Sequence, residues 1–288
     1  MTEAVRQSWL HVIVNTWDRA FDPGSGWLCL PGNSRRIREH AGDGKEVESL
    51  YYALALLELA DRPRQGRAEA IMARVMAWQK TTAIPQAARD LGMGLWLIRF
   101  RHRTRLPAEL RQQLEEACLD AAHLAARTDA TAASVFVQLA AAEPGHDDTG
   151  MRGLLEDLMR MVSTASPQET ASLLVALHAI ESNVRHPLVR EQIGPLVVSA
   201  WREAARRFGR SGKDRPDAVT TALAMRATQG LAGGAIVPEA DQLRALLCVL
   251  AINLRLPDAF PETLAALWAS GPGPVRKSPV AGLEVGAF

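Results

Sequence analysis

The chain has little of what marks several specialised classes of protein. Its 288 residues include only two tyrosines and three cysteines. Cys29, Cys118 and Cys248 stand far apart and form no Cys-x-x-Cys pair, so we expect reduced thiols rather than a disulfide framework or a zinc motif. No apolar run reaches the roughly 18 residues of a membrane-spanning helix, and the first residues lack the pattern of a secretory signal. We therefore expect a cytoplasmic protein without a membrane segment.

The chain also lacks an excess of charge and the motifs of common cofactors. Lys plus Arg number 33 and Asp plus Glu number 32, which leaves a net charge of only +1 and disfavours a nucleic-acid partner. It contains no glycine-rich phosphate loop and no Gly-x-Ser-x-Gly elbow. No His, Cys and Asp residues stand at metal-ligand spacing. We expect neither a cofactor nor a metal.

Helix-forming residues and helical periodicity fill most of the sequence. Ala, Leu and Arg dominate, and apolar residues recur at helical spacing along nearly the whole chain. Helices that open successive pairs are predicted to start near residues 66, 107, 148 and 187, a spacing of about 40 residues that suggests a repeated two-helix unit. We predict an all-α domain of about six antiparallel helix hairpins over residues 1–270, followed by a Gly/Pro-rich tail at 271–288. Either an open α/α solenoid or a closed α/α toroid fits this pattern.

Local signals predict where several helices begin and end. The sequence at Ser166–Glu169 combines a cap, a first-turn proline and a capping glutamate. Asp43 and Asp129 stand where helix caps stand. The Pro/Gly-containing segment Arg62–Gly66 predicts a break between helices. A short apolar helix is expected at Leu91–Phe100, although two glycines weaken its start.

A resemblance to a known superfamily covers the segment between residues 17 and 79. The stretch from His40 to Gln79 has a polar turn, the helix ESLYYALALLEL, a short break and an alanine-rich helix that ends in Trp-Gln. It is preceded by WDRAFDPGSGW. This arrangement resembles the early hairpins of six-hairpin α/α-toroid proteins, a superfamily of glycoside hydrolases and polysaccharide lyases. The resemblance favours a toroid over an open solenoid. It implies a carbohydrate-active protein that uses acid/base chemistry in a central cavity and takes an oligosaccharide ligand.

In such a toroid, the loops that lead into the inner helices would surround the substrate. The polar residues that these entrances would gather are His40, Asp43, Glu46, Arg89, Asp90, Asp129, Glu169 and Asp217. Glu48 lies three residues before Tyr51 and four before Tyr52, so the three side chains can share one helix face.

These residues supply the groups for acid/base work on a sugar. Glu48, Tyr51, His40 and Asp129 are the candidate catalytic residues, with carboxylates of suitable separation flanking a glycosidic bond. The candidate substrate-binding residues are Trp17, Trp27, Tyr52 and Asp43. Each of them also has an ordinary structural interpretation, as a helix cap, a core ring or a solvated charge.

A non-catalytic protein is the alternative interpretation, and the sequence leaves open whether the chain is an enzyme. The same helix pairs would suit a helical-repeat adaptor or inhibitor that binds another protein. Two basic runs, at residues 99–105 and 202–215, either complement helix C-termini or bind an acidic partner.

Overall fold

The computed structural model describes residues 3–29, 45–60, 62–82, 84–143, 148–208, 223, 240–252 and 254. These residues are almost entirely helical, which confirms the predicted all-α class. The helices are α1 (Glu3–Ala20), α3 (Lys45–Leu59), α4 (Arg62–Thr82), α5 (Pro85–His102), α6 (Ala108–Ala125), α7 (Ala132–Ala142), α8 (Asp148–Thr164), α9 (Pro167–Asn183), α10 (Pro187–Phe208) and α12 (Ala240–Ala251), with a 3-10 turn η1 (Arg103–Arg105). A two-stranded antiparallel ribbon joins β1 (Phe21–Asp22) to β2 (Trp27–Leu28).

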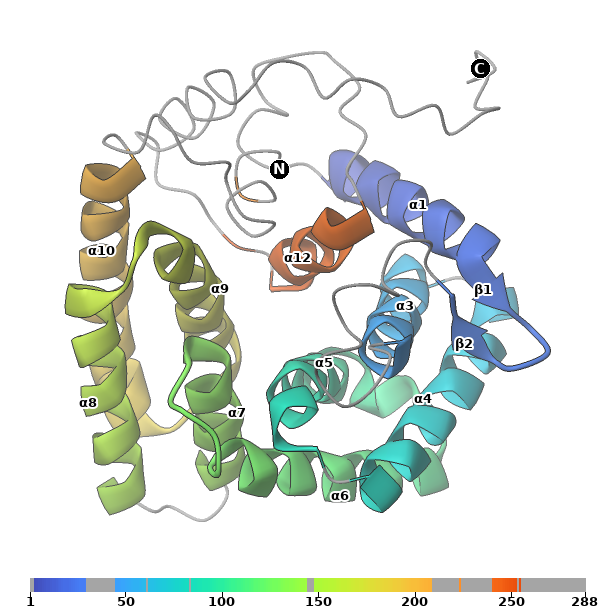
Figure 1. Ribbon diagram of the computed structural model, residues 1–288, viewed down its shortest axis with the longest axis horizontal. Coiled ribbons are helices and arrows are strands. Elements are labelled where there is room, and N and C mark those ends of the chain that lie inside the picture. Colours follow the sequence, from blue (N-terminus) through green and yellow to red (C-terminus); the bar gives the residue numbers. More distant parts are fainter. Residues whose placement is uncertain are drawn as a thin grey trace.

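The described helices form an inner and an outer layer (Figure 1). Helices α3, α5, α7, α9 and α12 lie inside, and α1, α4, α6, α8 and α10 lie around them. Along the inner layer α3 packs on α5, α5 on α7 and α7 on α9. Helix α12 contacts both α3 and α1, so a late part of the chain returns to the beginning.

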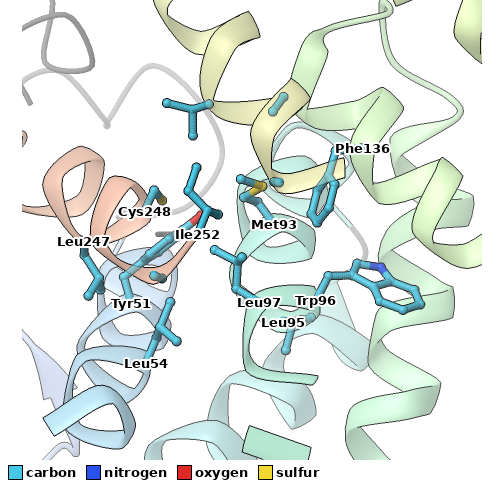
Figure 2. Close-up of a cluster of buried hydrophobic side chains, with 14 of the residues drawn as sticks. Tyr51, Leu54, Met93, Leu95, Trp96, Leu97, Phe136, Leu247, Cys248 and Ile252 are labelled. Atoms are coloured by element: carbon cyan, nitrogen blue, oxygen red, sulfur yellow. The ribbon is translucent and has the colours of Figure 1, made fainter. Parts of the chain in front are cut away.

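One continuous core joins these helices. Buried apolar side chains from α1 through α12 form a single hydrophobic cluster. Within it, Tyr51 and Leu54 of α3 face Leu247 and Cys248 of α12 (Figure 2). One domain over residues 1–270 remains a prediction, because most residues beyond 252 lie outside the described part. No described helix is long and apolar enough to cross a membrane.

The predicted helix starts agree well with the structure except at the second outer helix. Outer helices α6, α8 and α10 begin at Ala108, Asp148 and Pro187, within one residue of the predicted starts. The predicted break at Arg62–Gly66 is wrong, because α4 already begins at Arg62. A proline in the first helical turn removes an N–H that has no partner there anyway, so Pro63 starts the helix rather than breaking it.

One predicted helix cap is confirmed and another is wrong. Ser166 caps α9, and the Glu169 side chain completes a capping box as predicted. Asp129 does not cap α7, and that prediction is wrong. Thr131 is the cap instead, and its hydroxyl accepts a hydrogen bond from the backbone N–H of Ser134. Asp43 lies outside the described residues.

Two glycines in α5 bring this helix close to its neighbours rather than weakening it. Helix α5 runs continuously from Pro85 to His102, beyond the predicted Leu91–Phe100. A Cβ atom on Gly92 would lie 2.9 Å from Val137, and one on Gly94 would lie 3.0 Å from Leu50. Glycine therefore allows α7 and α3 to approach α5 more closely than any other residue would.

A buried carboxylate joins the last turns of the inner helices α3 and α5. The Glu58 side chain of α3 is only 2% exposed. It accepts hydrogen bonds from Arg6 of α1 and from Arg101 and His102 of α5. Arg6 also donates from Nε to the backbone oxygen of Leu250 in α12, at 3.3 Å. We call Glu58, Arg6, Arg101 and His102 the Glu58 network.

The Glu58 network determines the ionisation of its carboxylate. Burial by itself raises the pKa of Glu58, but hydrogen bonds and charge from His102 and Arg101 outweigh it and lower this pKa to about 2. Glu58 therefore stays ionised across the physiological range.

The packing of α5 predicts opposite effects of two glycine substitutions. Gly92→Ala should lower the free energy of unfolding by about 1–3 kcal/mol, because the new methyl group overlaps Val137. Gly153→Ala in α8 has nothing within 4 Å of its new Cβ. It should raise stability by about 0.5–1 kcal/mol through helix propensity alone. Urea denaturation followed by circular dichroism measures both; equal shifts would contradict the close approach at Gly92.

The Glu58 network predicts a pH-dependent stability. Because the pKa of Glu58 is lowered from 4.5 to about 2 on folding, its stabilisation is complete above about pH 4.5 and is lost as the pH falls toward 2. Glu58→Gln should destabilise the fold by about 3–5 kcal/mol near neutral pH, because it leaves buried arginines without an anion. Denaturation of both proteins should show this difference shrinking between pH 4.5 and 2. The exposed Glu156→Gln serves as control; a difference that stays constant with pH would contradict the assignment.

Candidate functional site

The first turns of three inner helices bring two carboxylates to one arginine. Nη1 of Arg244 on α12 lies 3.5 Å from Glu48 of α3 and 3.8 Å from Asp90 of α5. The Glu48 side chain is 15% exposed, whereas those of Arg244 and Asp90 are 36% and 40% exposed. Solvent therefore reaches this group of charges from one side. Since the last turns of the same helices meet at the Glu58 network, α3, α5 and α12 run in the same direction.

Tyr51 lies beneath this group and stays protonated. Its hydroxyl donates to the backbone oxygen of Asp90 at 3.0 Å, and its ring lies 5.6 Å from the guanidinium carbon of Arg244. Burial raises the pKa of Tyr51 well above 10 and that of the neighbouring Cys248 thiol to about 12. Tyr51 therefore holds the Asp90 segment in place, and Cys248 is not a thiolate nucleophile at neutral pH. We call Glu48, Tyr51, Asp90, Arg244 and Cys248 the entrance cluster.

The geometry of the entrance cluster suits a pair of carboxylates acting together. Glu48 and Asp90 both contact one nitrogen atom, so the two contacting oxygens lie no more than about 7.3 Å apart. Paired carboxylates that flank a glycosidic bond are separated by roughly 5–9.5 Å. Ionised carboxylates can serve as a general base or a nucleophile.

Tyr52 and Trp17 belong to a different cluster from Tyr51. The Tyr52 hydroxyl hydrogen-bonds with Asp18 of α1 and accepts from Arg67 of α4 at 2.8 Å. Its ring meets that of Trp17 edge-on, with centroids 6.1 Å apart. Both residues are fully buried. Their rings therefore pack in the core between α1, α3 and α4 rather than lying open to a sugar.

The other predicted site residues do not join the entrance cluster in the described structure. Trp27 lies half-buried in β2, with the guanidinium of Arg74 5.7 Å from its ring centroid. Asp129 lies exposed in the segment before α7. His40 and Asp43 lie outside the described residues. Among the six predicted residues that the structure describes, only Glu48 and Tyr51 come together at this place.

The first basic run pairs within the molecule. Arg99 and Arg103 contact Glu115 of α6 at 2.5 and 2.9 Å, and Arg105 donates to the backbone oxygen of Leu57 at 3.0 Å. With Arg101 in the Glu58 network, these arginines hold α3, α5 and α6 together. Half of the second run, residues 209–215, lies outside the described residues. Its Arg206 contacts Glu203 at 3.1 Å within α10.

The sequence places Asp90 among the polar entrance residues but carries no signal for Arg244. Arg244 occupies an ordinary position in an amphipathic helix, and no local pattern distinguishes it from other arginines. Its role depends on α12 packing beside α3, which is a long-range contact. Within the described part of the chain, no three His, Cys, Asp or Glu residues are grouped to hold a metal ion.

The burial of both tyrosines predicts how the tyrosinate absorbance of the protein changes with pH. The pKa of Tyr52 is raised to about 12 by burial and by its hydrogen bond to Asp18, and burial raises that of Tyr51 well above 10. Because the chain has only these two tyrosines, the folded protein should show almost no tyrosinate absorbance at pH 10. A solvated tyrosine is half ionised there, since its pKa is about 10. Chain unfolded in guanidinium should titrate with that ordinary midpoint; half-ionisation of the folded protein at pH 10 would contradict the burial of either ring.

Known proteins provide no assignment for this site. No family model, no curated protein and no solved structure matches the chain. The function of this chain therefore has to be inferred from the geometry of its own side chains.

Proposed function

We propose that this chain is a carbohydrate-active protein of the α/α-toroid kind, which acts by acid/base chemistry at the entrance cluster. The observation that carries the proposal is the pair of carboxylates, Glu48 and Asp90, brought from two inner helices to one arginine. Hydrolysis of a glycosidic bond uses two carboxyl groups that flank the bond at a separation of roughly 5–9.5 Å. The two oxygens that contact Arg244 lie no more than about 7.3 Å apart, which is compatible with such a pair.

The arrangement of the helices supports a closed ring. Inner helices contact one another in chain order, from α3 through α5 and α7 to α9. Helix α12 then packs against α3 and α1, which brings the late part of the chain to the first inner helix (Figure 1). An open solenoid would not bring these parts of the chain together, because each of its repeats contacts only its neighbours.

The members of the entrance cluster have separable roles in this proposal. Asp90, the more exposed carboxylate, would contact the attacking water or the anomeric carbon of the sugar. Glu48 would lie on the other side of the glycosidic bond. Arg244 orients both carboxylates. Tyr51 is a positioning residue, because its hydroxyl is engaged with the backbone of Asp90. His40 stays a prediction for a further catalytic residue, and Asp43 stays a prediction for a substrate-binding residue.

One observation favours the alternative of a non-catalytic helical protein that binds a partner. Glu48 and Asp90 are both ion-paired with Arg244, as expected of charges that only join helices. In that case the entrance cluster is a structural contact between α3, α5 and α12.

A substrate panel and charge-neutralising variants test the proposal. The wild-type protein is assayed with neutral oligosaccharides and with uronate polymers, by release of reducing ends and by the ultraviolet absorbance of unsaturated uronates. Glu48→Gln and Asp90→Asn should each lower kcat by at least about 100-fold, because acid/base groups contribute that much or more. Tyr51→Phe should have a smaller effect, since it only loosens the Asp90 segment.

Glu115→Gln is the matched control, because this carboxylate also pairs with arginines but lies on α6. Its activity should equal that of the wild type. If neither entrance variant changes kcat by more than about threefold, far below a typical acid/base contribution, the site assignment is wrong. No activity and no binding across the panel would favour the non-catalytic alternative.

A further inference from the structure

A cavity lies at the end of the inner helices opposite the entrance cluster. Its volume is about 470 Å³, within the range of sites for small molecules. Arg101 of α5 lines one part of it, and His178, Glu181, Ser182 and Asn183 at the end of α9 line another. Ala251 and Ile252, at the end of α12, also line it. None of these residues belongs to the entrance cluster.

Arg101 presents a positioned donor to this cavity. Its Nε and Nη2 both donate to the buried Glu58 carboxylate, which fixes the plane of the guanidinium. Its other terminal nitrogen, Nη1, donates to no acceptor among the described residues. The guanidinium is always charged, and its planar edge suits a carboxylate. The cavity therefore offers one strong site for an anionic group.

The α9 side of the cavity presents acceptors instead. Trp201 donates from Nε1 to Nε2 of His178 at 2.9 Å. An indole nitrogen only donates, so the proton of the neutral imidazole is on Nδ1, which donates to Glu181 Oε2 at 3.1 Å. This contact positions the Glu181 carboxylate, whose side chain is 43% exposed. Asn183 donates its amide N–H to the backbone oxygen of Ala179, which leaves its carbonyl oxygen as an acceptor.

Helix dipoles favour a cationic group on the α9 side. Helix α9 ends at the cavity, at Asn183, and a helix C-terminus carries a partial negative charge. Cations are favoured within the last turn of a helix, which is where Glu181 stands. On the other side it is the charge of the Arg101 guanidinium, and no helix dipole, that favours an anionic group.

We propose that this cavity binds a free α-amino acid with an apolar side chain. Its carboxylate would pair with Arg101, and its ammonium group would pair with Glu181 and the Asn183 carbonyl. The apolar side chain would lie against Ala251 and Ile252. Oppositely charged ends and an apolar body match the three kinds of surface that line the cavity. The proposal does not depend on carbohydrate activity at the entrance cluster.

Isothermal titration calorimetry with three matched probes tests the proposal. L-leucine carries both charges, leucinamide lacks the carboxylate, and N-acetyl-L-leucine lacks the ammonium group. L-leucine should bind at least tenfold more tightly than either analogue. Equal affinity for all three probes, or no heat from L-leucine at millimolar concentration, would overturn the proposal. Tighter binding of a uronic acid than of L-leucine would also overturn it.

Two variants place the binding site. Glu181→Gln should weaken L-leucine at least fivefold without unfolding the protein, because this side chain lies partly in solvent. Asp157→Asn is the matched control, an acidic residue on α8 that also pairs within its own helix, with Arg160. It should leave the affinity unchanged.

Arg101→Lys keeps the charge beside Glu58 but loses the planar edge of the guanidinium. This variant should abolish the preference for L-leucine over leucinamide. An unchanged affinity in Glu181→Gln would exclude this cavity as the site.

Discussion

The arrangement of the inner helices depends on the burial of one carboxylate. Glu58 is almost fully removed from solvent, and an ionised group in such a place destabilises a fold unless it is paired and hydrogen-bonded. Its partners come from α1 and α5, and Arg6 extends the network to the end of α12. Four helices therefore have to meet at one point. Their rotation and their position along the axis are fixed by hydrogen-bond geometry as well as by apolar packing.

The same helices carry the two polar regions with functional potential. Because α3, α5 and α12 run side by side in one direction, their first turns meet at the entrance cluster and their last turns meet near the cavity. Arg101 belongs to both the Glu58 network and the cavity lining, so the pairing that stabilises the fold also orients a charged group in the cavity wall. Helix α12 contributes Arg244 at one end and Ala251 at the other. A change in its packing would affect both regions.

The candidate site could be predicted only where it depends on helix geometry. Glu48 and Tyr51 share a face because they lie three residues apart on one helix, and the structure places them together. Tyr52 points elsewhere, to Asp18 and Arg67, because adjacent residues on a helix lie about 100° apart around its axis. Asp129 shows the limit of a capping argument. A nearby threonine offered the same kind of acceptor, and Thr131 is the residue in register with the first free N–H groups of α7.

The sequence by itself determined the all-α class, the start of most outer helices and the cap at Ser166. These features depend on interactions within one or two helical turns, such as periodicity, first-turn prolines and caps, and the residues concerned are close in sequence. Only the tertiary structure decided which charges meet. Glu58 and Arg6 are 52 residues apart, and the contact of Arg6 with Leu250 spans 244. No local pattern encodes such a pair, because it forms only after several helices have packed around a shared core.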